Sequence, residues 1–244
     1  MKPRKFAAIG AIVSILVLSE SPVGTALAAP ESPHIFSANV ALTSNFMFRG
    51  VSQTNNGPAI QGGFDYEYGP YDIYAGVWAS NVDSSSKGYN GASMELDMYA
   101  GLAPSWKKID LDLGYVRYEY PRAKTSINNT NEVYFGLSST IRRLFTPSYK
   151  IYYSHNFFGY RSAWYHDLSL KMLLPHGFSL AGHHGWTRFD QANLKNYQDY
   201  SVGISREYRG FGFDLSWVGR SDEECSSLPF HDGGTGVFTL SKSF

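Results

Sequence analysis

Cysteine, net charge and long apolar runs are scarce or absent in this chain. Its 244 residues include one cysteine, Cys225, so no disulfide can form within the chain, and we expect this lone cysteine to be incidental. Basic and acidic side chains balance at 21 each. Nucleic-acid binding needs a basic excess, so no nucleic-acid partner is expected. A transmembrane helix needs about 18 consecutive apolar residues, and no such run follows residue 28.

The N-terminus has the three parts of an export signal. Residues 2–5 are basic, residues 6–18 form an apolar run too short to span a bilayer, and Ala26 and Ala28 are small residues where a signal peptidase reads them. The pattern predicts a cleaved Sec-type signal at residues 1–28 and one mature domain at residues 29–244. The alternative is an ordinary buried N-terminal helix.

Apolar and polar residues alternate with a period of two from residue 35 onward, which is typical of β-strands. Between residues 94 and 102, Met94 and Leu96 share one face while Glu95 and Asp97 share the other. An unpaired acid in lipid costs several kcal/mol, whereas a wet interior solvates it. We expect strands at residues 35–48, 59–68, 71–82, 92–103, 107–120, 131–141, 146–157, 161–173, 177–188, 197–207, 210–220 and 235–244.

The expected connections sort into short and long ones. Tight turns are expected near residues 69–70, 104–106, 142–145, 175–176 and 208–209, and longer polar segments near 49–58, 83–91, 121–130, 189–196 and 221–234. Short periplasmic turns opposite longer loops are the pattern of outer-membrane barrels. We predict an all-β fold, a closed antiparallel transmembrane β-barrel of about 12 strands in an up-and-down meander. The last strand, ending at Phe244, is expected to pair with the first.

Aromatic residues are abundant, with 18 Tyr, 16 Phe and 5 Trp. Tyr and Trp suit a bilayer interface, where one end of the ring meets lipid and the other meets water. Soluble all-β proteins also favour aromatics, so composition alone does not decide the class. Residues near strand ends would form the girdles of a barrel, unless some point inward; they are Tyr66, Tyr68, Tyr71, Trp106, Tyr118, Tyr120, Tyr149 and Trp186.

Three segments of the first half resemble a known family. They are SNFMFRGVSQT at residues 44–54, PAIQGGFDY at 58–66 and YAGVWASNVD at 74–83. These segments are similar to the TorF-type family of Gram-negative outer-membrane proteins, for which a pore function has been proposed. The resemblance implies an outer-membrane β-barrel surrounded by lipid and lipopolysaccharide, and it supplies no catalytic residues. Phe244 resembles the C-terminal aromatic signal that such barrels present to the barrel-assembly machinery.

A first group of candidate site residues lies near the loop ends of the first three predicted strands. Strand parity points Arg49, Gln61, Trp78 and Ser80 into the lumen. One hypothesis is that Arg49, with polar residues of the adjacent loops, shapes the outer mouth of a pore. The alternative is that Arg49 pairs with a lumen carboxylate and locks the barrel.

A second group gives the lumen an acidic lining. Acids on the inward parity outnumber the bases Lys150 and Lys171, and an acidic lining favours cations in a narrow channel. These acids are Asp65, Glu67, Glu95, Asp97, Asp110, Asp112, Glu132, Asp167 and Asp214. We therefore predict a porin-like channel for small hydrophilic solutes or ions, with a weak preference for cations and without a cofactor or metal.

Two other classes of protein stay open. Twelve strands lie between small filled barrels and wide porins, so a plugged structural or adhesive barrel is an alternative. A membrane-embedded, lipid-modifying enzyme is the third class, but Ser154 and His155 face opposite sides of a strand and no serine lies in a G-x-S-x-G pattern. His183 and His184 also face opposite sides, which argues against a metal site there.

Overall fold

The computed structural model describes residues 32–244, apart from residues 86–88, 90, 125–128, 191–193 and 221–233. The predicted signal at residues 1–28 and Cys225 lie outside the described residues. Within the described part of the chain, no helix is both long and apolar enough to cross a membrane.

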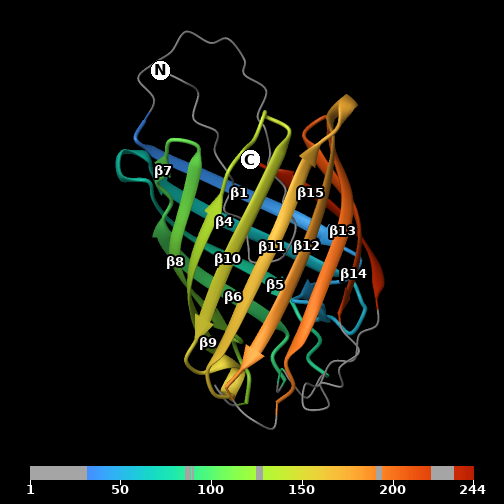
Figure 1. Ribbon diagram of the computed structural model, residues 1–244. Coiled ribbons are helices and arrows are strands. Elements are labelled where there is room, and N and C mark those ends of the chain that lie inside the picture. Colours follow the sequence, from blue (N-terminus) through green and yellow to red (C-terminus); the bar gives the residue numbers. More distant parts are fainter. Residues whose placement is uncertain (1–31, 86–88, 90, 125–128, 191–193, 221–233) are drawn as a thin grey trace.

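Twelve long strands form the wall of a closed antiparallel β-barrel (Figure 1). They are β1 (His34–Thr43), β4 (Ala59–Tyr68), β5 (Ile73–Asn81), β6 (Met94–Leu102), β8 (Ile109–Glu119), β9 (Thr130–Ser138), β10 (Phe145–Ser154), β11 (Ala163–Leu173), β12 (Phe178–Phe189), β13 (Tyr197–Tyr208), β14 (Phe211–Arg220) and β15 (Thr235–Ser243). Short two-residue strands also occur; they are β2 (Met47–Phe48), β3 (Val51–Ser52) and β7 (Ser105–Trp106). The predicted fold class and number of wall strands are confirmed, and each predicted range overlaps one wall strand.

The barrel closes where the last strand meets the first. Each wall strand pairs with its neighbours along the chain, and β15 pairs with β1, which places Leu240 opposite Leu42. Beyond this ladder, Ala38 and Phe244 exchange backbone hydrogen bonds of 3.2 and 2.9 Å. Closure matters because the backbone of a membrane-spanning sheet has no water to bond and must pair its own edges.

Tight turns lie at one end of the barrel, where β1 begins and β15 ends (Figure 1). We name this the short-turn end and the opposite one the loop end. Asp72 and Arg209 have positive φ angles of 53° and 54°, a conformation that tight hairpins favour. The 3₁₀ turns η1 (Gly69–Tyr71) and η4 (Pro175–Gly177) coincide with predicted Pro-containing turns. At the loop end, η3 (Phe157–Gly159) lies in the connection between β10 and β11.

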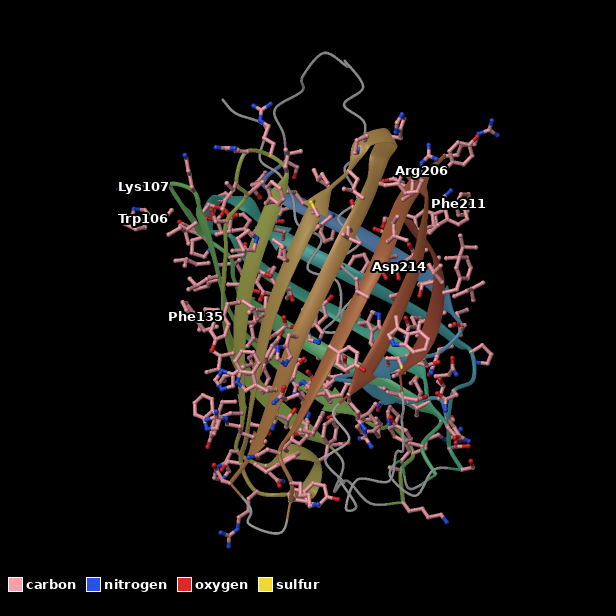
Figure 2. All side chains as sticks on the ribbon, turned by 45° about the vertical axis from the view of Figure 1, so that its right-hand side comes forward. Trp106, Lys107, Phe135, Arg206, Phe211 and Asp214 are labelled. Carbon is pink, nitrogen blue, oxygen red and sulfur yellow. The ribbon has the colours of Figure 1, made fainter. Side chains whose placement is uncertain are left out.

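The outer face of the wall is apolar. On β14, Phe213, Leu215 and Trp217 are 40%, 59% and 52% exposed. Figure 2 shows Trp106 and Phe135 projecting outward from the wall in the same way. A water-soluble protein rarely exposes an apolar belt of this extent, whereas lipid solvates it. The alternation therefore gives the barrel a lipid-compatible outside and leaves the polar side chains to the lumen.

One strand boundary of the sequence-based prediction is wrong, and the structure decides which of two tyrosine placements holds. The first strand ends at Thr43 and not at residue 48, because residues 44–57 leave the wall and fold into the lumen. Tyr118 and Tyr120 do not belong to an outer girdle, since they are only 1% and 5% exposed and lie inside the barrel. They share the inward parity of Val116 on β8, which is fully buried.

Candidate functional site

Residues 44–57, named here the inner segment, cross the lumen near the loop end of the barrel. Phe46 packs edge-on against Trp78 of β5, with ring centroids 5.3 Å apart. At the far side of the lumen, Gly50 lies so close to β13 that a Cβ on it would come within 2.8 Å of Asp199 Cβ. Residues 45–54 are all buried. The inner segment therefore spans the barrel from one wall to the other.

Hydrogen bonds within the inner segment hold it in shape. β2 and β3 form a two-residue hairpin whose tip residues, Arg49 and Gly50, have φ angles of 49° and 75°, as a hairpin turn of this hand requires. Asn45 joins the two arms: its Oδ1 accepts from Ser52 Oγ at 2.7 Å, and its Nδ2 donates to Asn56 Oδ1 at 2.9 Å. The segment is thus a folded element with its own register.

A buried ion pair anchors the tip of the inner segment. The two terminal nitrogens of Arg49 donate to the two carboxylate oxygens of Glu132 on β9 at 2.9 and 2.7 Å, and the side chains are 3% and 2% exposed. Tyr118 donates to Glu132 at 3.0 Å, and the guanidinium lies 4.0 Å from the ring centroid of Tyr165. Breaking such a bidentate pair leaves an uncompensated buried charge. The second of the two hypotheses for Arg49 expected an ion pair with a lumen carboxylate, and the structure contains this contact.

Between the inner segment and the short-turn end, the lumen is polar and partly open to solvent; we name this space the vestibule. Five of the predicted lumen acids are partly exposed there: Asp65, Glu67, Asp112, Asp167 and Asp214. Strands β12–β15 and β1 contribute small inward residues to it, such as Ala181, Gly203 and Ser241. These partly exposed side chains make this part of the lumen polar and accessible to solvent.

The other predicted site residues divide between the loop end and the rim. Five are buried around the inner segment: Gln61, Trp78, Glu95, Asp97 and Glu132. Lys171 is also buried, but it lies near the short-turn end of β11. Asp110 is exposed at the short-turn rim, where it accepts a hydrogen bond from Ser105 Oγ at 2.7 Å. The predicted acids are therefore spread along the whole barrel.

Tyrosine side chains occupy the β5–β10 side of the vestibule and form hydrogen bonds with its acids. Tyr74 donates to Asp112 at 2.6 Å, and its oxygen lies 2.5 Å from the hydroxyl of Tyr134. Lys150 binds the second oxygen of Asp112 at 2.6 Å. Bulky side chains therefore occupy the β5–β10 side, whereas the β12–β15 side has small inward residues such as Ala181 and Gly203.

A cluster that the sequence did not reveal lies beside the tip of the inner segment. His183 of β12 bridges two acids: its Nδ1 is 3.1 Å from Asp167 Oδ2, and its Nε2 is 2.6 Å from Asp199 Oδ1. Tyr165 donates to the same oxygen of Asp199 at 3.1 Å. Parity alone points His183 and Asp199 inward, but their meeting depends on the register of three strands, which no local pattern specifies.

A cavity of about 30 Å³ separates the inner segment from the β12–β15 wall. Its lining includes Met47 and Gly50 of the segment, and His183, Ser201 and Val237 of the wall. A buried water needs about 10–15 Å³ of such volume, so the space suits roughly two waters. The inner segment therefore leaves a narrow gap on the β12–β15 side, where the inward residues are small.

Contacts with the loops also hold the inner segment. Tyr89 of the β5–β6 connection donates to Gln53 Oε1, and the amide of Asp83 donates to the Gln53 carbonyl at 2.9 Å. Burial raises the pKa of the Tyr89 phenol well above its ordinary value, so this phenol stays protonated and remains a donor. The segment is bonded to the loop end as well as to the wall.

The residues weighed for catalysis do not come together. Ser154 is buried and bonds to Thr130 at 3.0 Å, whereas His155 is exposed. His166 stacks on Trp186, with ring centroids 5.2 Å apart. In the part of the chain that the structure describes, no three His, Cys, Asp or Glu residues are grouped to hold a metal ion.

These features define a β-barrel of the outer-membrane type with a polar, acid-rich lumen. The chain belongs to a bacterial family of unknown function (Gcw_chp), which matches it over residues 27–244. The match supplies this family name and does not confirm the TorF-type name. No curated protein matches the chain.

Solved structures with a similar barrel include porins and channels. The NanC porin has a TM-score of 0.55 and 8% identity, and the match covers 86% of this chain and 99% of that one. The KdgM porin, solved in complex with disordered oligogalacturonate, has a TM-score of 0.56 and 6% identity over 86% and 98% of the two chains. An outer-membrane channel from Pseudomonas putida F1 has a TM-score of 0.52 and 10% identity over 92% and 100%. At such identities the likeness establishes the fold alone.

Proposed function

We propose that this protein is a porin-like channel of the Gram-negative outer membrane, which passes small hydrophilic solutes or ions and prefers cations. The observation that supports this most directly is the acid-rich vestibule together with the small cavity beside the inner segment. A dry or purely structural barrel has no need to leave ionisable side chains in contact with solvent inside it. The barrel fold shared with porins and channels agrees with the proposal.

The proposed path follows the β12–β15 side of the lumen. Small inward residues such as Ala181 and Gly203 line this side of the vestibule. At the inner segment the path narrows to the gap beside Gly50, whose volume is about 30 Å³. A gap of this size admits water and small ions, so we expect a much smaller conductance than that of a wide porin.

The proposed preference for cations rests on inward acids that form no ion pair with a base among the described residues. Asp65 accepts from the hydroxyl of Tyr99, and Asp214 accepts from Ser216 at 3.0 Å. An acidic lining of this kind in a narrow space attracts cations and repels anions. The KdgM porin was solved with an acidic oligosaccharide; the acidic lining of this chain suits neutral or cationic solutes instead.

The same proposal includes export and assembly. Residues 1–28 would direct Sec-type export, and Phe244 would address the barrel-assembly machinery. The Phe244 side chain is 71% exposed at the end of β15, so it is accessible as a signal must be. Outer-membrane lipid and lipopolysaccharide would then surround the apolar belt.

A planar-bilayer recording of the refolded mature chain tests the channel. We expect discrete conductance steps and, in a KCl gradient, a reversal potential of the sign that K⁺ selectivity gives. Ser201→Trp fills the gap and should reduce the conductance severalfold. Val202→Trp is the matched control, because Val202 follows directly on β13 but is 52% exposed on the outer face. Heat-modifiable migration in gels verifies that both variants fold.

A plugged structural or adhesive barrel is the second candidate, and the buried ion pair that anchors the inner segment favours it. Silent bilayers from correctly folded protein would support the plugged barrel and contradict the channel. Equal conductance of wild type and Ser201→Trp would leave a channel but overturn the path proposed for it.

A further inference from the structure

Cations and aromatic rings gather on the outer face of β12–β15 at the short-turn end. Strand register sets them side by side: Phe178 lies opposite Arg206, Arg206 opposite Phe213, and the register of β14 with β15 brings Phe211 opposite Lys242. Figure 2 shows Arg206 and Phe211 near the short-turn rim. Neighbouring strands are about 4.8 Å apart, so the cluster is roughly 15 Å wide.

Aromatic rings hold two of these cations in position. The guanidinium carbon of Arg206 lies 4.9 Å from the ring centroid of Phe178, and Lys242 Nζ lies 4.6 Å from that of Phe211. A cation over a ring has lost side-chain freedom but keeps N–H donors for an anion. The two side chains are therefore arranged in advance for a negatively charged ligand.

Arg209, in the β13–β14 turn, adds a third cation at 5.3 Å from the ring of Tyr208. The acids nearest in sequence, Glu207 and Asp214, have the inward parity of their strands. Among the described residues, no carboxylate forms an ion pair with Arg206, Arg209 or Lys242. Among the described residues, the cluster thus carries three positive charges that no side-chain carboxylate pairs.

The surface next to the cluster is apolar. Toward the middle of the barrel, Leu215 and Phe238 are 59% and 48% exposed on the same outer face. Cations at a membrane rim followed by exposed hydrocarbon match a lipid that has a phosphate headgroup and acyl chains. Because the short-turn end of outer-membrane barrels faces the periplasm, the lipid that meets this rim is a phospholipid of the periplasmic leaflet.

We propose that the outer face of β12–β15 at the short-turn end binds an anionic phospholipid, whose phosphate is held by Arg206, Arg209 and Lys242. Its acyl chains lie along the exposed apolar residues of β14 and β15. The site depends on insertion of the barrel in a membrane, but not on whether the lumen conducts.

Native mass spectrometry of the mature chain in detergent tests the site. The protein, with Phe244 as its untagged end, is mixed with equimolar phosphatidylglycerol and phosphatidylethanolamine of matched acyl chains. We expect phosphatidylglycerol adducts to predominate. A cation at a membrane surface contributes roughly a fivefold preference for anionic lipid. The triple variant R206Q/R209Q/K242Q should therefore lower the preference for phosphatidylglycerol on the order of a hundredfold, so that it binds both lipids alike.

The matched control is K107Q/R142Q/R143Q, which removes three cations of the same rim near β7–β10 and should keep the preference. Lys242→Gln alone should lower it by roughly fivefold, which tests the site if the triple variant does not fold. Equal binding of both lipids by the wild type, or a preference that survives R206Q/R209Q/K242Q, overturns the proposal. Stronger binding of lipid A than of phosphatidylglycerol in a third arm overturns the assignment to the periplasmic leaflet.

Discussion

Arg49 and Glu132 are 83 positions apart in the sequence and meet inside the barrel through two hydrogen bonds of 2.9 and 2.7 Å. Arg49 belongs to the inner segment, which has left the wall, whereas Glu132 belongs to β9. The pair joins a crossing element to the wall that it reaches. Its strength therefore governs whether the inner segment stays in the lumen.

Removal of the carboxylate should release the inner segment. Glu132→Ala leaves the guanidinium buried without its partner, which costs about 3–5 kcal/mol. We expect a lower midpoint of unfolding in urea and a larger, noisier conductance in planar bilayers. Arg117→Ala is the control, since the Arg117–Glu119 pair is equally short at 2.6 Å but exposed and is worth at most about 1 kcal/mol. Lost stability with unchanged conductance would mean that the Arg49–Glu132 pair only locks the barrel.

A side chain at position 50 should displace the tip of the inner segment. Gly50→Ala combines positive φ with a Cβ at 2.8 Å from Asp199 Cβ, whereas Gly210→Ala meets the same φ of 75° and open space. The strain of positive φ, about 1 kcal/mol, is common to both variants. We expect Gly50→Ala to lower the free energy of unfolding by about 1–3 kcal/mol more than Gly210→Ala. If both variants lost the same free energy of unfolding in urea titrations, the close contact of position 50 with β13 would be relieved without a cost in stability.

Neutral substitutions in the vestibule should weaken the preference for cations. The double variant Asp65→Asn/Asp214→Asn removes two inward acids that accept hydrogen bonds from hydroxyls. Neither acid forms an ion pair with a base among the described residues. The reversal potential in a KCl gradient should move toward zero while the conductance changes little. Glu119→Gln, in the exposed pair with Arg117, serves as the control and should leave the reversal potential unchanged. A shift of equal size in both variants would place the selectivity outside the vestibule.

Arginine substitutions at adjacent positions of β11 should distinguish the two faces of the wall. Leu168 is 51% exposed on the outer face, and Leu168→Arg at this mid-strand position should cost about 2–4 kcal/mol in a bilayer. Ser169→Arg faces the vestibule beside Asp167, whose oxygen Ser169 already bonds, and should cost much less. Folding yield and unfolding free energy in lipid vesicles provide the measurement. Similar losses for both variants would contradict the assignment of faces.

Most of the wall could be predicted from local patterns. On β6, the alternation of Met94 and Leu96 with Glu95 and Asp97 predicts which side chains face lipid, and the structure has this alternation of exposure. Pro-containing turns at residues 69–70 and 175–176 appear as η1 and η4. Such features depend on residues close in sequence, because a strand's period and a turn's backbone angles are local properties.

The misplaced residues are those for which a local pattern has two meanings. Residues 44–48 continue the alternation of β1 and so resemble its last part, but they belong to the inner segment. Tyr118 and Tyr120 have the composition of an interfacial girdle, yet their hydroxyls bond to the lumen acids Glu132 and Glu95 at 3.0 and 2.8 Å. A tyrosine suits either place because one end of the ring is apolar and the other bonds to water or a carboxylate.

By itself, the sequence determined a closed barrel of twelve strands with an apolar outside and an acid-rich inside. Periodicity and turn chemistry are enough for this, since closure is the way for a sheet in lipid to pair its edges. Only the tertiary structure decided what lies within the barrel. The inner segment, the Arg49–Glu132 pair and the bridge of His183 between Asp167 and Asp199 all join residues distant in sequence. These contacts depend on strand register and on a loop that folds back into the lumen. Neither feature produces a periodic pattern in the sequence.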